Sequence, residues 1–264
     1  MDFGLTSNLT SWLPLSFLVW AVMMAVYHAA GLLFEWADRT KFLAPFKVRD
    51  SDKLSYAALL PRVLFNQTFV LLPSMIFLQW MGLAFTGSPH LGLWHFVAAL
   101  VFMGVGHDVV QYFSHRVLLH RPSLFRKLGH SLHHSTGASR AISACYMTAA
   151  DFFLEITLPY LVPLALVAAG ADPFFHFAAA SLGALGGLYE HSGYDFAVRL
   201  RQEDKPGAQH RLLALLAQLI SSKAHGEHHR RGNVSFSDGF GSPGICDTFF
   251  KTRWDLVRAR PRAR

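Results

Sequence analysis

Histidine is the residue whose frequency and spacing first point to chemistry in this chain. The sequence contains 15 histidines among 264 residues, and nine of them fall into a repeating pattern. These nine are His115, His120, His130, His133, His134, His191, His225, His228 and His229. Imidazole is the commonest metal-ligating side chain in proteins, so this dense and patterned set predicts a metal centre.

Most of these histidines stand in boxes whose spacing suits helices. Two boxes read HxxHH, at residues 130–134 and 225–229. Residues i, i+3 and i+4 share one face of an α-helix, so each box directs two or three imidazoles toward one point. His115 and His120 are five residues apart, which is a rotation of about 140° on a regular helix. Because Pro122 disfavours helical backbone at the residue before it, we expect the helix to end near His120 and its ring to turn back.

The number of histidines exceeds the capacity of one ion. Eight or more converging imidazoles imply two metals, whereas a closed structural zinc site has four ligands, usually including cysteine. The chain has two cysteines, Cys145 and Cys246, and no CxxC pair. It also lacks the HExxH box of zinc proteases and the P-loop and GxSxG motifs. The pattern therefore predicts a dinuclear, histidine-rich centre.

Residues around the boxes extend the pattern. They read Asp108-x3-Tyr112-x2-His115-Arg116-x3-His120, His130-x2-His133-His134-Ser135, His225-x2-His228-His229-x3-Asn233 and Asp247-Thr-Phe-Phe-Lys-Thr-Arg-Trp-Asp255. In this arrangement the chain resembles the fatty acid hydroxylase/sterol desaturase superfamily, over about residues 100–255.

The resemblance implies a membrane-bound oxidoreductase with two non-haem iron ions as cofactor and O2 as co-substrate, the nine box histidines being the ligands. Zinc can replace iron in the purified protein, because imidazole binds both metals. Electrons are expected from a separate donor: a cytochrome b5, a ferredoxin or a reductase. Asp108, Tyr112 and Asn233 are expected to support the ligands rather than to bind metal. The alternatives are a polar helix end for the first two and a turn cap for Asn233.

One position departs from the family's pattern. Some hydroxylases of the family have a second histidine one turn before the equivalent of His191, where this chain has Gly187. We therefore expect nine histidine ligands, with the remaining position filled by water, Glu190 or His107.

Apolar stretches must position these histidines. Apolar residues make up 52% of the chain and charged residues 16%, against about 25% charged in a typical soluble domain. Five apolar stretches stand out, at residues 12–34, 63–85, 91–106, 152–169 and 173–189. A bilayer-spanning helix needs about 20 apolar residues, so the first three are expected to span, and the last two form either two spans or a short hairpin. The second is expected to begin with a polar turn at Asn66, Gln67 and Thr68.

The predicted fold class is an all-α integral membrane protein with four or five membrane helices and a helical, histidine-rich cap. It is expected to be one domain over residues 1–264. Buried helices of a soluble all-α protein are the alternative. Residues 212–220 are too short to span and predict a helix that lies at the membrane interface.

The basic residues predict which face carries the boxes. All 24 lysines and arginines fall within residues 35–62, 114–151 and 190–264. Basic loops stay on the cytosolic side of a membrane, so the histidine boxes are expected on the cytosolic face, of the endoplasmic reticulum in a eukaryote or of the inner membrane in a bacterium. This topology and contact with anionic membrane lipids account for the net charge of +7, so no nucleic-acid partner is expected.

The function expected from these features is O2-dependent oxidation of a lipid-like substrate, with hydroxylation favoured over desaturation. Gly183, Gly186 and Gly187 form an open wall beside His191 that leaves room for oxygen. A desaturase with the same centre is the first alternative. A divalent-metal transporter is the second, although it requires polar ligands near the bilayer midplane. The substrate class stays open among acyl chains, sterols, terpenoids and polyketides.

Overall fold

The computed structural model describes residues 12–51, 54–200, 208–237, 242 and 244–257. These residues form helices and turns with two isolated β-bridges, and no strand occurs among them. The all-α class expected from the sequence is therefore confirmed.

Four long helical segments are apolar enough to cross a membrane, which identifies a membrane protein. They are α2 (Leu15–Thr40); α3 (Tyr56–Asn66) continued by η2 (Gln67–Leu71) and α4 (Leu72–Trp80); α5 (Leu93–Phe113) continued by η3 (Ser114–Leu119); and α8 (Ala149–Phe152) continued by η5 (Phe153–Thr157) and α9 (Leu158–Leu166). The fourth of the predicted stretches is thus one of these candidate spans.

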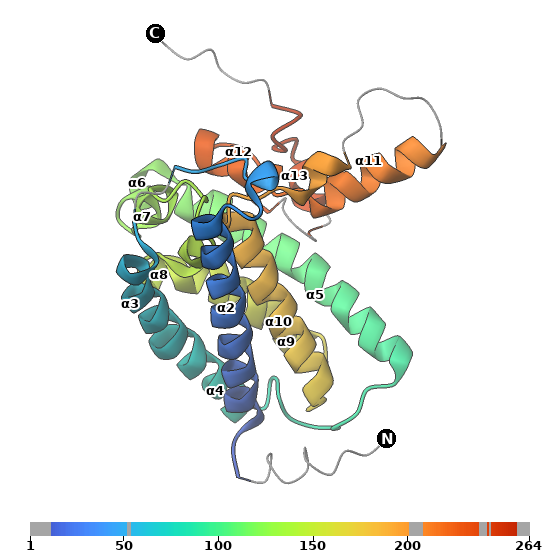
Figure 1. Ribbon diagram of the computed structural model, residues 1–264. Coiled ribbons are helices and arrows are strands. Elements are labelled where there is room, and N and C mark those ends of the chain that lie inside the picture. The colour runs from blue at the N-terminus through green and yellow to red at the C-terminus, as the bar shows by residue number, and fades with distance from the viewer. Residues whose placement is uncertain (1–11, 52–53, 201–207, 238–241, 243, 258–264) are drawn as a thin grey trace.

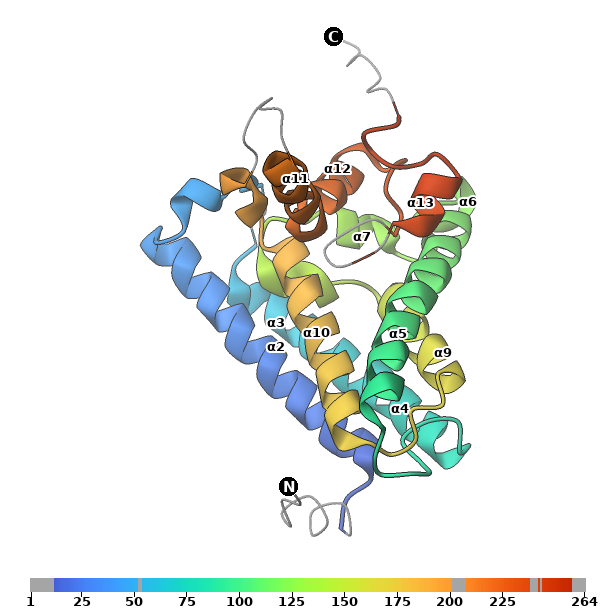
Figure 2. The ribbon, with the colours of Figure 1, turned by 90° about the vertical axis from the view of Figure 1, so that its right-hand side faces the viewer.

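The fifth long helix, α10 (Pro173–His191), is not one of these four candidate spans, because His176, Glu190 and several glycines dilute its apolar residues. It nevertheless runs through the same bundle, packed along α2, while α5 packs along α9 (Figures 1 and 2). Gly106 permits the second contact, since a Cβ at this position would lie 2.7 Å from the Cβ of Pro163.

The second span differs from its prediction at its start. The helix begins at Tyr56, where the Ser55 hydroxyl accepts a hydrogen bond from the backbone N–H of Ala58. The prediction of a polar turn at residues 66–68 is wrong, because these residues continue the helix. Asn66 is fully buried, and its amide donates to the carbonyls of Cys145 (3.0 Å) and Met147 (2.9 Å). Tertiary hydrogen bonds therefore let a polar side chain remain in an apolar helix.

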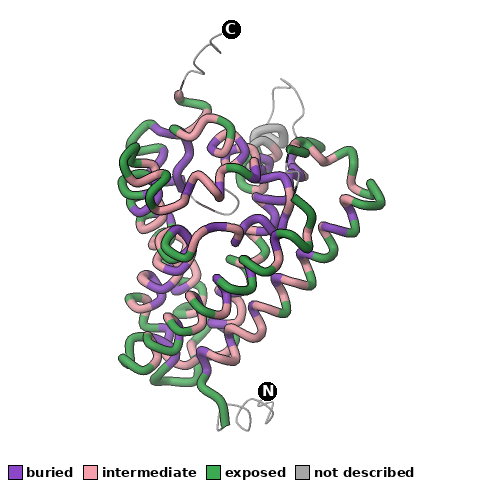
Figure 3. Tube along the Cα trace, turned by 90° about the vertical axis from the view of Figure 1, so that its left-hand side faces the viewer, coloured by how far each residue is buried: buried purple, intermediate pink, exposed green. Residues whose placement is uncertain are grey.

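Apolar side chains divide between the interior of the bundle and its outer surface. Val19, Leu59 and Met75 are fully buried between the helices. Large apolar side chains such as those of Trp80 (77%) and Trp94 (82%) remain exposed, and Figure 3 shows exposed positions along the helices of the bundle. In water such a surface would aggregate, whereas in a bilayer it is the surface that contacts lipid.

Short helices form a cap at the upper end of the bundle (Figure 1). They are η1 (Ala44–Phe46), α6 (Pro122–Phe125), α7 (His130–His134), η4 (Ala141–Cys145), η6 (Phe196–Arg199), α11 (Ala208–Ile220), α12 (Lys223–Arg231) and α13 (Ile245–Phe249). The interfacial helix expected at residues 212–220 lies within α11, which runs across the end of the bundle.

Arg49 connects the cap segments that carry the histidine boxes. Its guanidinium donates to the carbonyls of Ala138 (3.0 Å), Glu190 (2.7 Å) and Ser222 (3.2 Å). Ala138 follows α7, Glu190 lies at the end of α10, and Ser222 precedes α12. The Arg49 side chain therefore joins the three helices. Gly226 is required beside it, because a Cβ there would lie 2.3 Å from Arg49 Nη1.

Candidate metal centre

The first box depends on a π-helical turn. The α5 helix continues as η3, in which the backbone N–H of His120 bonds to the carbonyl of His115 at 2.8 Å. This i→i+5 bond widens the turn and brings the two rings to one side, with centroids 4.8 Å apart. The helix ends at His120 as expected, with Arg121 extended before Pro122. The widened turn, which the sequence analysis did not foresee, makes the two rings converge.

Glycines begin and end the short helices of the other two boxes. Gly129 precedes α7 with a φ of 83°, and a Cβ there would lie 2.2 Å from Thr148 Cγ2. Gly232 ends α12 with a φ of 71°, and its N–H bonds to the carbonyl of His228. Left-handed backbone of this kind is available to glycine at little cost, so each box is confined to a few turns. His191 is the last residue of α10.

The structure brings the nine box histidines together in two groups, and each could hold one metal ion. Group one contains His115, His120, His130, His134 and His228. Group two contains His133, His191, His225 and His229. Both HxxHH boxes therefore contribute to both groups.

The ligand nitrogens within each group lie close together. In group one the Nε2 atom of His130 is 3.1 Å from Nε2 of both His115 and His120. In group two Nε2 of His191 is 3.1 Å from Nε2 of His133 and 3.0 Å from Nε2 of His225. Metal–imidazole bonds are about 2.0–2.1 Å long, so adjacent ligands of one ion lie about 3 Å apart. The observed separations fit that requirement.

Hydrogen bonds to the outer ring nitrogens establish which nitrogen faces the centre with a lone pair. Nδ1–H of His115 donates to the carbonyl of Phe236 (2.7 Å), and Nδ1–H of His228 donates to that of Val234 (2.7 Å). In group two, Nδ1–H of His191 donates to its own helix at 3.0 Å. A carbonyl can only accept, so Nε2 of each ring carries a lone pair. Converging lone pairs repel one another, and a cation removes that repulsion.

Burial keeps these rings neutral, as metal binding requires. It lowers the pKa of His133, His225 and His228 well below its ordinary value, and neighbouring imidazoles lower it further. Neutral rings at physiological pH leave the Nε2 lone pairs available. The donor set therefore fits two divalent metal ions bound mainly by imidazole.

Two buried carboxylates belong to the same region, although the sequence analysis did not assign them to it. Asp151 Oδ1 accepts a hydrogen bond from His130 Nδ1–H at 2.9 Å, an arrangement that orients a metal-binding ring. Glu155 Oε1 is 3.7 Å from His115 Nε2 and 3.6 Å from His133 Nε2. Ionisable residues inside an apolar span usually serve a function, and that signal was present in the sequence at Glu155, whereas Asp151 precedes the apolar stretch expected at residues 152–169.

The three residues that the sequence analysis predicted to support the ligands, Asp108, Tyr112 and Asn233, lie elsewhere. Asp108 accepts hydrogen bonds from the backbone N–H groups of Ile245 (2.9 Å) and Cys246 (3.0 Å). Tyr112 stacks on Phe250 at 5.0 Å between ring centroids. These two side chains thus hold the C-terminal segment against α5, whereas Asn233 is exposed.

The two residues proposed to complete the ligand set are not on the ligand side. Glu190 Oε2 is 3.9 Å from Nδ1 of His225, the outer nitrogen of that ring. His107 belongs to neither group among the described residues.

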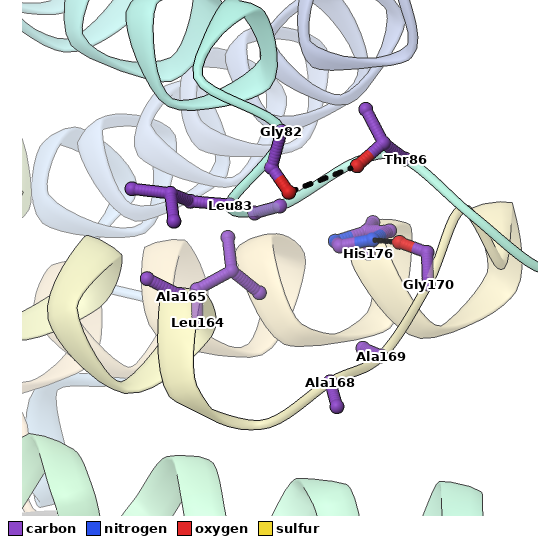
Figure 4. Close-up of a pocket in the computed structure, with 10 residues that line it drawn as sticks. Gly82, Leu83, Thr86, Leu164, Ala165, Ala168, Ala169, Gly170 and His176 are labelled. Atoms are coloured by element: carbon purple, nitrogen blue, oxygen red, sulfur yellow. Dashed lines mark hydrogen bonds between the residues drawn. The ribbon is translucent and has the colours of Figure 1, made fainter.

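A cavity lies at the opposite end of the bundle and is separate from the nine box histidines. Its volume is about 330 Å³, and its lining includes Leu83, Leu164 and His176 (Figure 4). His176 is 15 residues before His191 on α10, a distance of about 22 Å along the helix. The cavity therefore does not adjoin the candidate metal centre.

The family comparison agrees with this geometry. A sequence model of the family described as fatty acid hydroxylase matches residues 99–252, a range that includes every box histidine and both buried carboxylates. Neither a curated protein nor a solved structure matches the chain significantly.

Proposed function

Because the chain belongs to the fatty acid hydroxylase family, a family of hydroxylases and desaturases, we propose that it oxidises a C–H bond of a lipid-like substrate with O2 at a centre of two iron ions. Hydroxylation is the favoured reaction. One oxygen atom of O2 enters the product and the other leaves as water, with two electrons and two protons supplied. The cofactor, the co-substrate and the reaction are parts of one proposal.

The observation that carries this proposal is the pair of histidine groups. His115, His120, His130, His134 and His228 would hold one ion, and His133, His191, His225 and His229 would hold the other. When bound, the two ions would supply the redox chemistry by which O2 is reduced and the C–H bond is oxidised.

The protein's own contribution is to orient the ligands and exclude water. The carbonyls of Phe236 and Val234 and the carboxylate of Asp151 each fix one ring of group one by accepting its Nδ1–H. Buried His115, His130 and His228 keep this side of the centre dry. Water exclusion favours oxidation of the bound substrate over side reactions.

The location of the centre supports a substrate dissolved in the bilayer. His115 lies in η3, the turn that continues α5, and His191 ends α10, so both ligands stand where helices of the bundle meet the cap. A lipid-like molecule between these helices would bring a carbon near its polar end to the centre.

The distribution of basic residues favours a centre on the cytosolic face of the membrane, with electrons from a cytochrome b5, a ferredoxin or a reductase. Reporters fused at Gly87 and Ala171 should then lie on the opposite side from one fused at Arg264, and a reporter at Arg264 on the outer side would contradict the assignment.

The reaction is tested by reconstitution under 18O2 with extracted membrane lipids and a reductase. We expect one labelled oxygen in an alcohol product, found by mass spectrometry against lipids from cells without the protein. An unlabelled, unsaturated product would contradict hydroxylation and favour a desaturase.

The transporter alternative has no support, because the box histidines gather at one end of the bundle and the family consists of oxidoreductases.

A further inference from the structure

Glu155 is a buried carboxylate between the two histidine groups. It belongs to η5, the π-helical turn within the α8–α9 segment, and is 3% exposed. Its Oε1 atom lies 3.7 Å from Nε2 of His115 in group one and 3.6 Å from Nε2 of His133 in group two. One oxygen atom therefore approaches the ligand nitrogens of both groups.

Glu155 lies beside a second buried carboxyl group, that of Asp151, which stabilises a negative charge on it only when Asp151 is itself protonated. The ion-pair distances of Glu155 among the described residues are all to histidine. His115 presents a lone pair to Oε1, because its only N–H donates to Phe236. His130 lies 3.3 Å from Oε2 but donates its Nδ1–H to Asp151, and Oε2 has no hydrogen-bond partner. An unpaired buried carboxylate is costly, and a cation beside it removes that cost.

The distances permit Glu155 to share one ion with His115 and the other with His133, whereas the cluster of possible ligands that includes Glu155 is formed with His130 and Asp151. Metal–nitrogen and metal–oxygen bonds are about 2.0–2.2 Å long, so two ligand atoms of one ion lie at most about 4.2 Å apart. Both Oε1 separations are below this limit. Group two has only four histidines against five in group one, and two divalent ions bound only by neutral imidazoles would leave their charge uncompensated.

We propose that Glu155 is a carboxylate ligand shared by the two metal positions. This inference rests on the proposed function, in that it requires two metal ions. It replaces Glu190, whose carboxylate lies beside the outer nitrogen of His225, and His107, which belongs to no cluster of possible metal ligands among the described residues.

The test compares Glu155→Gln with Glu190→Gln, which neutralises a carboxylate on the outer side of a ligand ring. Each full-length protein is loaded with zinc in detergent and titrated with a chelator, and retained zinc is counted. Outer contacts to a metal ligand change affinity by about 10–100-fold, so loss of a direct ligand should lower the retention of zinc by about 100-fold or more in Glu155→Gln. Glu190→Gln should change it by less than about 10-fold, because its carboxylate is 3.9 Å from His225 Nδ1, beyond hydrogen-bonding distance.

A second measurement begins with the wild-type protein, so its first result does not depend on how a variant folds, and each variant is then compared at a zinc concentration that saturates it. The infrared difference spectrum between zinc-loaded and zinc-free wild-type protein should show a carboxylate band that shifts on metal binding. The shift should persist in Glu190→Gln and disappear in Glu155→Gln. Wild-type zinc retention in Glu155→Gln, or absence of the shift from the wild-type protein, would overturn the proposal. A wild-type protein that binds one ion or none would instead contradict the dinuclear centre itself.

Discussion

The two histidine groups differ in how firmly their rings are held. In group one, three of the five rings donate Nδ1–H to an acceptor, namely the Phe236 carbonyl, the Val234 carbonyl or the Asp151 carboxylate. In group two, only His191 has such a bond in the part of the chain described, and its acceptor is in its own helix. Within the described residues, the Nδ1 atom of His133 and both ring nitrogens of His229 have no hydrogen-bond partner.

This difference predicts two unequal metal positions. Group one has five pre-oriented or closely packed ligands, so little freedom is lost when an ion binds. Group two has four ligands, and among the described residues only one of their outer ring nitrogens, that of His191, is held by a hydrogen bond, so more ordering must accompany binding. We expect the ion of group one to bind more tightly, since outer contacts raise metal affinity.

The largest effect should come from removing one ligand of each group. We expect the wild-type protein to retain two ions per chain, His133→Ala to retain one, and His133→Ala combined with His228→Ala to retain none, with loss of oxidation. Metal analysis of the purified proteins measures this directly. A double variant that keeps as much metal as the wild type would remove the basis for both groups.

A smaller effect, confined to group one, is expected from Asp151→Asn. The amide still accepts from His130 but carries no charge, so the affinity of group one should fall by about 10–100-fold. In a chelator titration, the chelator concentrations that remove the first and the second ion should be more similar in this variant than in the wild type. Glu227→Gln is the control, because Glu227 pairs with Arg230 and Arg231 at the surface of α12. An unchanged difference between the ions in Asp151→Asn would contradict the comparison.

The metal-free protein should lose stability as the pH falls below about 6.5. Burial, reinforced by neighbouring imidazoles, lowers the pKa of His225 and His229 well below its ordinary value. The unfolded chain then takes up protons that the folded chain refuses, so stability is complete above the unfolded pKa and declines below it. Each such histidine contributes up to about 1.4 kcal/mol per pH unit.

Thermal unfolding of the metal-free protein across this pH range measures the effect. His229→Phe should make the decline shallower by about one proton, whereas His90→Gln, at an exposed position outside both groups, should leave it unchanged. Equal pH dependence in all three proteins would show that the buried rings do not govern it.

The smallest effects concern the residues that lie away from the rings. Asp108→Asn should lower the free energy of unfolding by about 1–3 kcal/mol, because it weakens buried hydrogen bonds to the C-terminal segment. Asn233→Ala should change it by less than about 0.5 kcal/mol, as for other exposed positions. Thermal unfolding and metal retention distinguish the two, and a large loss of metal in Asn233→Ala would indicate a role at the centre that its exposure does not suggest.

The sequence predicted the features that depend on local pattern. Apolar stretches of near-spanning length indicated a helical membrane protein, and the box spacing indicated the family. The predicted start of the second span was wrong, because the side-chain amide of Asn66 donates to the carbonyls of Cys145 and Met147. These two residues lie 79 and 81 positions further along the chain. The positions of Asp151 and Glu155 beside the boxes were not foreseen either, since their four-residue spacing indicates a shared helical face but not what that face meets.

By itself, therefore, the sequence determined the all-α membrane class, the nine candidate ligands and the helical faces on which the HxxHH boxes present them. These follow from burial of apolar residues and from helix periodicity, which act over a few turns. Only the tertiary structure decided that His130 and His134 join one group while His133 joins the other, and that a π-helical turn brings His120 beside His115. The physical reason is that metal ligation depends on atoms converging within about 3 Å, and that convergence depends on how α5, α7, α10 and α12 pack together, which periodicity along one helix does not specify.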